Sequence, residues 1–119
     1  MDDIYKEIIL DHYQNPNHRG KVVGGIEEKE VNMSCGDSLK ISVKIEKGVI
    51  VDAKFEGGGC AISMAAVDML LDKVIGMKLS EVKKMSGSEI EEMMGIELTS
   101  SRKKCAYLGL EVLKKIDII

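Results

Sequence analysis

"LKISVKIEKGVIVDAKFEGGGCAIS", residues 39–63, decides the fold. In "LKISVKIE" every second residue is apolar; these residues are Leu39, Ile41, Val43 and Ile45. This alternation is the pattern of a β-strand with one buried face. The letters "KGV" then supply a hairpin turn, and "VIVDAKFE" continues as a second strand. The stretch therefore predicts an antiparallel pair of strands that runs, through three glycines, into a cysteine.

On both sides of this hairpin the pattern changes. From Cys60 onward apolar residues recur at helical spacing as far as Gly76, and further helices are expected in "LSEVKKM", in "SGSEIEEMMG" and over about residues 102–116. The two middle segments carry serines suited to capping. Before the hairpin, residues 3–13 predict a helix that "NPNHRG" ends, and "VVGGIEEKEVNM" offers a third strand. We predict an α+β fold in a single domain over 1–119: an N-terminal helix, a small three-stranded antiparallel sheet, then C-terminal helices packed on the sheet.

Composition excludes several classes of function. The chain has 119 residues and a formal net charge of −3, which gives no electrostatic case for binding nucleic acid. Its apolar runs are too short for a membrane span, and the start "MDDIYKEI" is acidic, unlike a signal peptide. We expect a cytoplasmic protein with neither nucleic acid nor membrane as a partner.

Three cysteines, Cys35, Cys60 and Cys105, form no CxxC pair, and their odd number disfavours a disulfide framework. They are buried small apolar residues, a nucleophile, or metal ligands gathered from distant parts of the chain. Each is expected at a junction between elements. Cys35 lies in the turn-like "NMSCGD", Cys60 opens a helix, and Cys105 falls in the first turn of the last helix beside the cationic "RKK". A helix N-terminus and neighbouring cations both favour a thiolate, so reactive or metal-binding thiols fit these positions best.

Asp37 makes a metal centre the sharper hypothesis. Three thiolates leave a tetrahedral centre one ligand short, and an aspartate two residues from Cys35 can supply the fourth. A hard carboxylate bonds iron bound to sulfide less well than a thiolate does, so one corner of such a site would open readily. His12 is expected to be a surface or capping residue, and two histidines are too few for a His-rich metal site.

Four motifs occur together in a specific order: "DHYQNPNHRG" (11–20), "SCGD" (34–37), "GGGCAIS" (57–63) and "RKKC" (102–105). In these motifs and their approximate spacing the chain resembles the IscU/NifU-type iron–sulfur cluster assembly scaffold proteins. The resemblance implies a scaffold for a labile [2Fe–2S] cluster that passes to apo-proteins, with no turnover chemistry of its own. It implies that sulfur arrives as persulfide from a cysteine desulfurase, which in the family binds near the first motif.

Carried over by position, the resemblance makes Cys35, Asp37, Cys60 and Cys105 the cluster ligands. It makes Cys105 the first sulfur acceptor, with the cation of Lys104 beside it. It leaves room for a homo-oligomer in which another protomer shares or shields the cluster.

The chain also departs from the family pattern. Lys104 stands where many IscU-type members have a histidine, and "LTSSRKK" replaces the proline-containing motif that a dedicated Hsp70 chaperone recognises. "RKKC" instead resembles the SufU branch, whose members bind zinc and relay sulfur, although the insertion that SufU-type proteins carry before the last cysteine is missing. Two alternatives to a cluster scaffold therefore stay open: a Zn²⁺-dependent sulfurtransferase using the same residues, and a metal-free helical interaction module.

Overall fold

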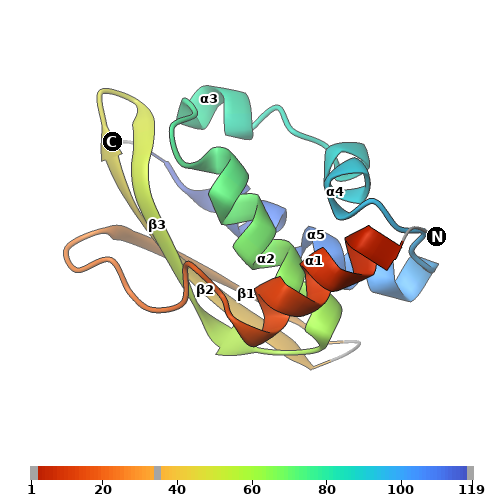
Figure 1. The fold of residues 1–119 in the computed structure, drawn as a ribbon. Helices are drawn as coiled ribbons and strands as arrows, with labels where there is room; N and C mark the ends of the chain where they lie inside the picture. The colour runs from red at the N-terminus through yellow and green to blue at the C-terminus, as the bar shows by residue number, and fades with distance from the viewer. Residues whose placement is uncertain (1–2, 34–35, 118–119) are drawn as a thin grey trace.

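The computed structural model describes residues 3–33 and 36–117. The elements, in chain order, are α1 (Asp3–Gln14), β1 (Ile26–Asn32), β2 (Asp37–Glu46), β3 (Val49–Gly58), α2 (Ala61–Val74), α3 (Leu79–Val82), α4 (Gly87–Met94) and α5 (Ser100–Lys115) (Figure 1). This order confirms the predicted α+β fold.

The three strands form one antiparallel sheet in the order β1-β2-β3, so β2 is the central strand. Lys47 and Gly48 make the tight turn between β2 and β3, with φ angles of 52° and 79°. Two successive positive φ angles are typical of the type I′ turn, whose twist matches that of the strands it joins. The predicted hairpin is therefore confirmed, including its turn.

A bulge in β3 shifts the alternation of buried residues. Lys44 pairs with Asp52 and Ile45 pairs with Ile50, so Val51 is an extra residue on the β3 side. Such an insertion lets the buried face resume after a step of three residues instead of two. Ile50 and Ala53 are accordingly both buried, and both strands keep one apolar face.

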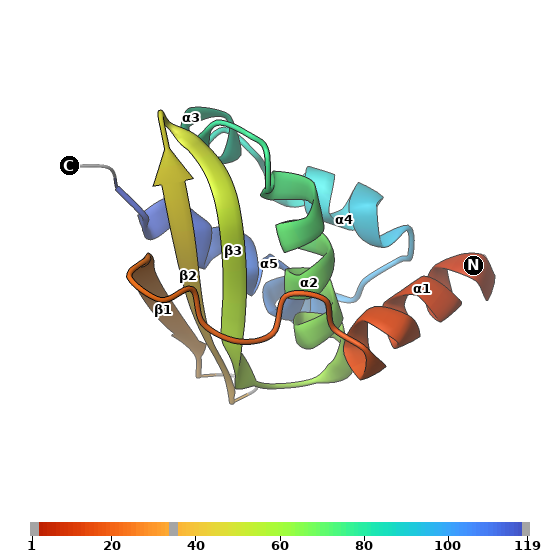
Figure 2. The ribbon, with the colours of Figure 1, turned by 60° about the vertical axis from the view of Figure 1, so that its left-hand side comes forward.

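The helices lie on one face of this sheet (Figure 2). Helices α2 and α5 pack against each other, α5 also packs on β1 and β2, and α1 packs on the outside of α2. The interior is filled mainly by aliphatic side chains and methionines, together with the ring of Phe55; those fully buried include Leu39, Ile41, Leu70, Leu108 and Leu113. On the other face of the sheet the 15–25 segment crosses the strands, where the Val22 N–H donates to Ser42 Oγ at 2.8 Å. The layers bring the N-terminus of α2 to the end of the sheet where β2 begins and β3 ends.

The helix ends differ from the predictions in two places. Ser86 caps α4 as predicted, and its backbone N–H donates to the Glu89 carboxylate at 3.0 Å. Ser80 lies inside α3, however, and Lys78 occupies the cap position, so the predicted Ser80 cap is wrong. Helix α5 begins at Ser100, two residues earlier than predicted, with Thr99 as its cap.

The longest helix, α5, covers Ser100–Lys115. Across the two described ranges, none of the helices has both the length and the hydropathy that crossing a bilayer requires.

Candidate metal centre

Three of the four predicted ligands meet at one end of the sheet. Asp37 is the first residue of β2, Cys60 is the N-cap of α2, and Cys105 lies in α5. One ligand atom from each residue lies within 4.8 Å of the other two. Asp37 is 1% exposed and Cys105 is 2% exposed, whereas Cys60 is partly exposed. A carboxylate and two thiols from three separate elements thus converge at a site that opens to solvent beside Cys60.

The glycine run before Cys60 is what lets Asp37 sit there. The backbone N–H of Cys60 donates to Asp37 Oδ1 at 3.0 Å. A Cβ on Gly59 would lie 2.2 Å from that same oxygen and 2.7 Å from the Asp37 Cγ atom, so any side chain at this position would displace the carboxylate. Gly57 has φ of +141°, and a Cβ there would lie 2.1 Å from the backbone oxygen of Ser38. Two of the three glycines are therefore required by close contacts that the sequence alone does not show.

Cys60 has the surroundings of a thiolate. Its sulfur accepts the Ser63 N–H at 3.5 Å, as an N-cap side chain does, and lies 3.7 Å from the Ser63 hydroxyl oxygen. Burial and the nearby Asp37 carboxylate both oppose ionisation. Hydrogen bonds with the Ser63 backbone N–H, the Ser63 hydroxyl and the Cys105 side chain outweigh them, and the pKa of Cys60 falls below its ordinary value of 9.0. The helix-start prediction for Cys60 is confirmed, and Ser63 is a supporting residue that the sequence reasoning missed.

The position of Cys105 in its helix differs from the predicted position. Because α5 begins at Ser100, Cys105 lies beyond the first turn, inside a regular helix and away from a junction. Of the cations expected beside it, the Lys103 ammonium pairs with Glu91 at 3.0 Å. Lys104 is exposed and lines a hollow between α5 and β1 with Glu30, Val31, Asn32, Met33, Leu108 and Glu111. Among the described thiols, Cys60 therefore combines a lowered pKa with partial exposure.

Cys35, the remaining predicted ligand, lies outside the described residues. Its neighbour Gly36 has φ of 72°, a left-handed conformation that glycine adopts without strain, as the turn prediction required. This left-handed residue directly precedes Asp37, the first residue of β2.

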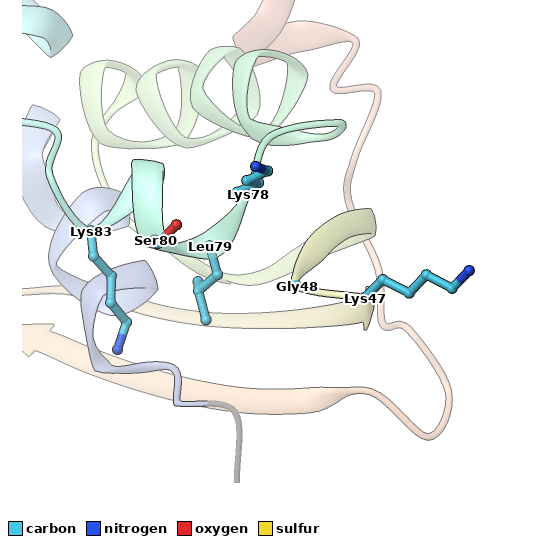
Figure 3. Close-up of a pocket in the computed structure, with 6 residues that line it drawn as sticks. All are labelled: Lys47, Gly48, Lys78, Leu79, Ser80 and Lys83. Carbon is cyan, nitrogen blue, oxygen red and sulfur yellow. The ribbon is translucent and has the colours of Figure 1, made fainter.

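A second hollow, of about 290 Å³, lies at the opposite end of the β2–β3 hairpin (Figure 3). Lys47, Lys78 and Lys83 line it, but their side chains point in different directions instead of converging (Figure 3). The Lys83 ammonium already pairs with Asp117 at 2.5 Å. The lysines that line this hollow therefore do not converge to bind an anion, and the hollow is not a candidate site comparable with the thiol group.

Comparison with known proteins gives the family. Residues 4–116 match the NifU-like N terminal domain. The chain belongs to this family. Among the similar proteins are the Zinc-dependent sulfurtransferase SufU of Bacillus subtilis, 38% identical over 64% of this chain and 52% of the relative, and the Iron-sulfur cluster assembly scaffold protein IscU of Thermotoga maritima, 42% identical over 66% and 56%. This chain thus matches only about half the length of these curated relatives.

A solved structure carries the likeness over the whole fold. The crystal structure of a putative iron–sulfur cluster assembly scaffold protein for the SUF system from Fervidobacterium islandicum superposes with a TM-score of 0.82. It is 28% identical and covers 95% of this chain and 96% of that one. Both the scaffold and the sulfurtransferase names occur among the relatives, so family membership leaves the choice between these two roles to the chemistry of the site.

Proposed function

We propose that this chain is a scaffold on which a labile [2Fe–2S] cluster is assembled and from which it passes to apo-proteins. The observation that carries the proposal is the convergence of Asp37, Cys60 and Cys105, whose ligand atoms lie within 4.8 Å of one another. The IscU-named relative and the family match support it. The cluster is cargo in this account, so the chain is a carrier and not an enzyme, and residues 1–119 act as one scaffold domain.

The donor set fits such a cargo. Thiolates are the usual ligands of iron–sulfur clusters, and the lowered pKa of Cys60 favours the ligating form. Cys35 would complete the set from the turn before Asp37. A carboxylate at the remaining position bonds the cluster less firmly than a fourth thiolate would, which suits a protein that must release what it holds.

A cysteine desulfurase is the partner that this function needs. A scaffold thiolate attacks the outer sulfur of the partner's persulfide; a new S–S bond forms, the old S–S bond breaks, and the partner's cysteine leaves as a thiolate. The resemblance names Cys105 as acceptor, with Lys104 nearby. Because Cys105 is 2% exposed, its use requires the site to open, whereas Cys60 is partly exposed and has a lowered pKa. Locating the persulfide by mass spectrometry, after incubation with a desulfurase and cysteine but no iron, decides between the two.

A zinc-dependent sulfurtransferase is the second candidate. Three thiolates and a carboxylate also suit tetrahedral Zn²⁺, and exchange of one ligand would free a thiolate to accept sulfur. Lys104, in place of a histidine, and the SufU-named relative favour this function. Elemental analysis of protein purified without oxygen separates the two, because a scaffold contains iron with acid-labile sulfide and the sulfurtransferase contains one zinc.

The experiment that tests the proposal is anaerobic reconstitution with iron and sulfide, followed by absorption and Mössbauer spectroscopy. We expect Cys60→Ser and Cys105→Ser to lose the cluster signal, and Asp37→Ala to keep it but to slow its transfer to an apo-protein. Glu56→Ala, which removes an exposed carboxylate from β3, is the matched control and should behave as the wild type. Failure of the wild-type protein to form a cluster with its thiols reduced would contradict the scaffold function.

A further inference from the structure

A second polar cluster lies farther along α2, where α1 and the 15–25 segment pack against it. Asp68 is 0% exposed; one of its oxygens lies 2.6 Å from His12 Nδ1 and the other accepts the His18 backbone N–H at 2.9 Å. One turn later, the Asp72 carboxylate contacts His18 Nε2 through one oxygen, and its other oxygen lies 3.9 Å from His12 Nε2. Two imidazoles from the N-terminal segment thus face two carboxylates of α2.

This cluster is separate from the thiol site, although both lie on α2. Asp68 and Asp72 are four residues apart, so they share one face of the helix. They follow Cys60 by eight and twelve residues, which places them about 12 and 18 Å farther along the axis at 1.5 Å per residue. A ligand held here would not be shared with the thiols.

The hydrogen bonds orient His12 for coordination. Because Asp68 accepts a hydrogen bond from Nδ1, this nitrogen carries the proton and Nε2 keeps its lone pair. Of the two His12 nitrogens, Nε2 is the one that lies near Asp72, at 3.9 Å from its carboxylate. A buried carboxylate that fixes a histidine tautomer in this way is the arrangement found behind the histidine ligands of metal sites. The contact therefore prepares His12 to bind a cation as well as holding α1 to α2.

The remaining groups supply a matching ligand set. Imidazole nitrogen and carboxylate oxygen are the ligands that Zn²⁺ and similar divalent ions take outside thiolate sites. Metal–ligand bonds of 2.0–2.2 Å at a tetrahedral angle separate the two ligand atoms by about 3.4 Å. The 3.9 Å between His12 Nε2 and Asp72 is close to this separation, and the side chain of Asp72, at 45% exposure, is able to adjust. The His12 and His18 side chains are only 15% and 17% exposed, so they are already held in place.

We propose that His12 Nε2, His18 Nε2 and the Asp72 carboxylate bind one divalent transition-metal ion of the Zn²⁺ type, with a fourth position open to water; the ion takes the place of the proton that His18 Nε2 donates to Asp72, and this proton leaves to solvent. This ion would connect α1 and the following segment to the helix that begins at Cys60. The site takes its ligands from nitrogen and oxygen alone, so it is independent of the cluster that the thiols are proposed to hold.

Co²⁺ is the probe that separates the two sites in one titration of the reduced wild-type protein without oxygen. Thiolate ligands give an intense near-ultraviolet charge-transfer band, whereas a nitrogen and oxygen site gives visible d–d bands only. We expect a second equivalent of Co²⁺ that adds d–d absorption with no further charge transfer. A titration in which no such equivalent binds overturns the proposal, whatever the thiol site does.

Variants assign the ligands. Asp72→Asn and His18→Gln should weaken binding of the second Co²⁺ at least tenfold and leave the charge-transfer band unchanged. Asp11→Asn removes the same charge from an exposed position next to His12 and should bind as the wild type does. Equal binding by Asp72→Asn and Asp11→Asn overturns the assignment.

Two further measurements keep the test independent of folding defects. Asp68→Asn should weaken the second Co²⁺ by about 10–100-fold while its d–d spectrum at saturation is preserved. If Asp68→Asn lowers the unfolding temperature but binds the second Co²⁺ as the wild type does, Asp68 has no role in the site. In wild-type protein labelled with ¹⁵N-histidine, a second equivalent of Zn²⁺ should move both Nε2 resonances, and resonances that stay in place contradict the proposal.

Discussion

Gly59→Ala is the substitution whose effect follows most directly from the geometry of the thiol site. The added Cβ would meet Asp37 Oδ1 at 2.2 Å and the Ser63 hydroxyl oxygen at 2.7 Å, distances that no packed structure keeps. The Asp37 carboxylate must therefore leave its position and lose the hydrogen bond from the Cys60 N–H. Gly59 has no positive φ in the structure, so the effect comes from this contact and not from backbone strain.

The expected loss of folding free energy in Gly59→Ala combines two contributions that overlap. Overpacking a tight site costs about 1–3 kcal/mol, and loss of a hydrogen bond to a charged group costs about 1.5–3 kcal/mol. Because the carboxylate relieves the clash by giving up the bond, we expect a total of about 2–4 kcal/mol. For a chain of this size that corresponds to a fall in Tm of about 8–16 °C.

The assay is thermal and urea unfolding of the metal-free protein, followed by Zn²⁺ titration. Gly58→Ala is the matched control, because a Cβ at Gly58 meets no atom within 4 Å. The control should change stability by less than about 0.5 kcal/mol and bind Zn²⁺ as the wild type does. If Gly59→Ala is as stable as Gly58→Ala and binds Zn²⁺ equally well, the account of how Asp37 is placed is refuted.

Three more predictions concern the thiols and the helix packing. Alkylation by iodoacetamide should modify Cys60 well before Cys105, because Cys60 is both more exposed and of lowered pKa; peptide mapping at short times measures the order, and faster labelling of Cys105 would contradict it. Ser63→Ala removes a hydroxyl that lowers the pKa of Cys60, so the rise of its alkylation rate with pH should move to higher pH; an unchanged profile would show that this hydroxyl does not stabilise the thiolate. Gly87→Ala places a Cβ 2.6 Å from the Tyr107 ring and should cost about 1–3 kcal/mol in urea unfolding, whereas a neutral result would mean that α4 moves freely on α5.

The sheet was predictable from the sequence because its signals are local. Alternation in β2 and the glycine of the turn at Gly48 each act over a few residues. The bulge at Val51 was not predictable, since the sequence pattern is compatible with either register and only the pairing partner selects one. Helix starts were predicted within two residues, although at α3 the cap position is Lys78 instead of the expected Ser80.

The sequence predicted that Asp37, Cys60 and Cys105 would lie together, as they do, but not the details of their arrangement. Asp37, Cys60 and Cys105 carry the chemistry in their residue types, so they could be selected before any fold was known. Cys60 and Cys105 differ in exposure, and this difference depends on how α2 and α5 pack, which the sequence does not show. The need for Gly59 was equally hidden, because a glycine in a loop shows no reason for its presence until its neighbours are in place.

The histidine cluster was missed for a physical reason. His12 was expected at the surface or as a cap, yet its side chain is 15% exposed and bonds a residue 56 positions away. Asp68 falls among the buried, mostly apolar residues of α2, where a carboxylate needs partners. That position was the available signal: a charged residue in the buried stripe of α2 implies a distant donor, although not which one.

The proposed function rests on the thiols and Asp37 holding iron together with sulfide. Its most direct test is to measure iron, acid-labile sulfide and zinc per protein chain. The wild-type protein is purified and reconstituted without oxygen for this measurement. The scaffold account predicts two irons and two sulfides in that site, lost together in Cys60→Ser. One zinc with no sulfide, unchanged after reconstitution, would contradict it.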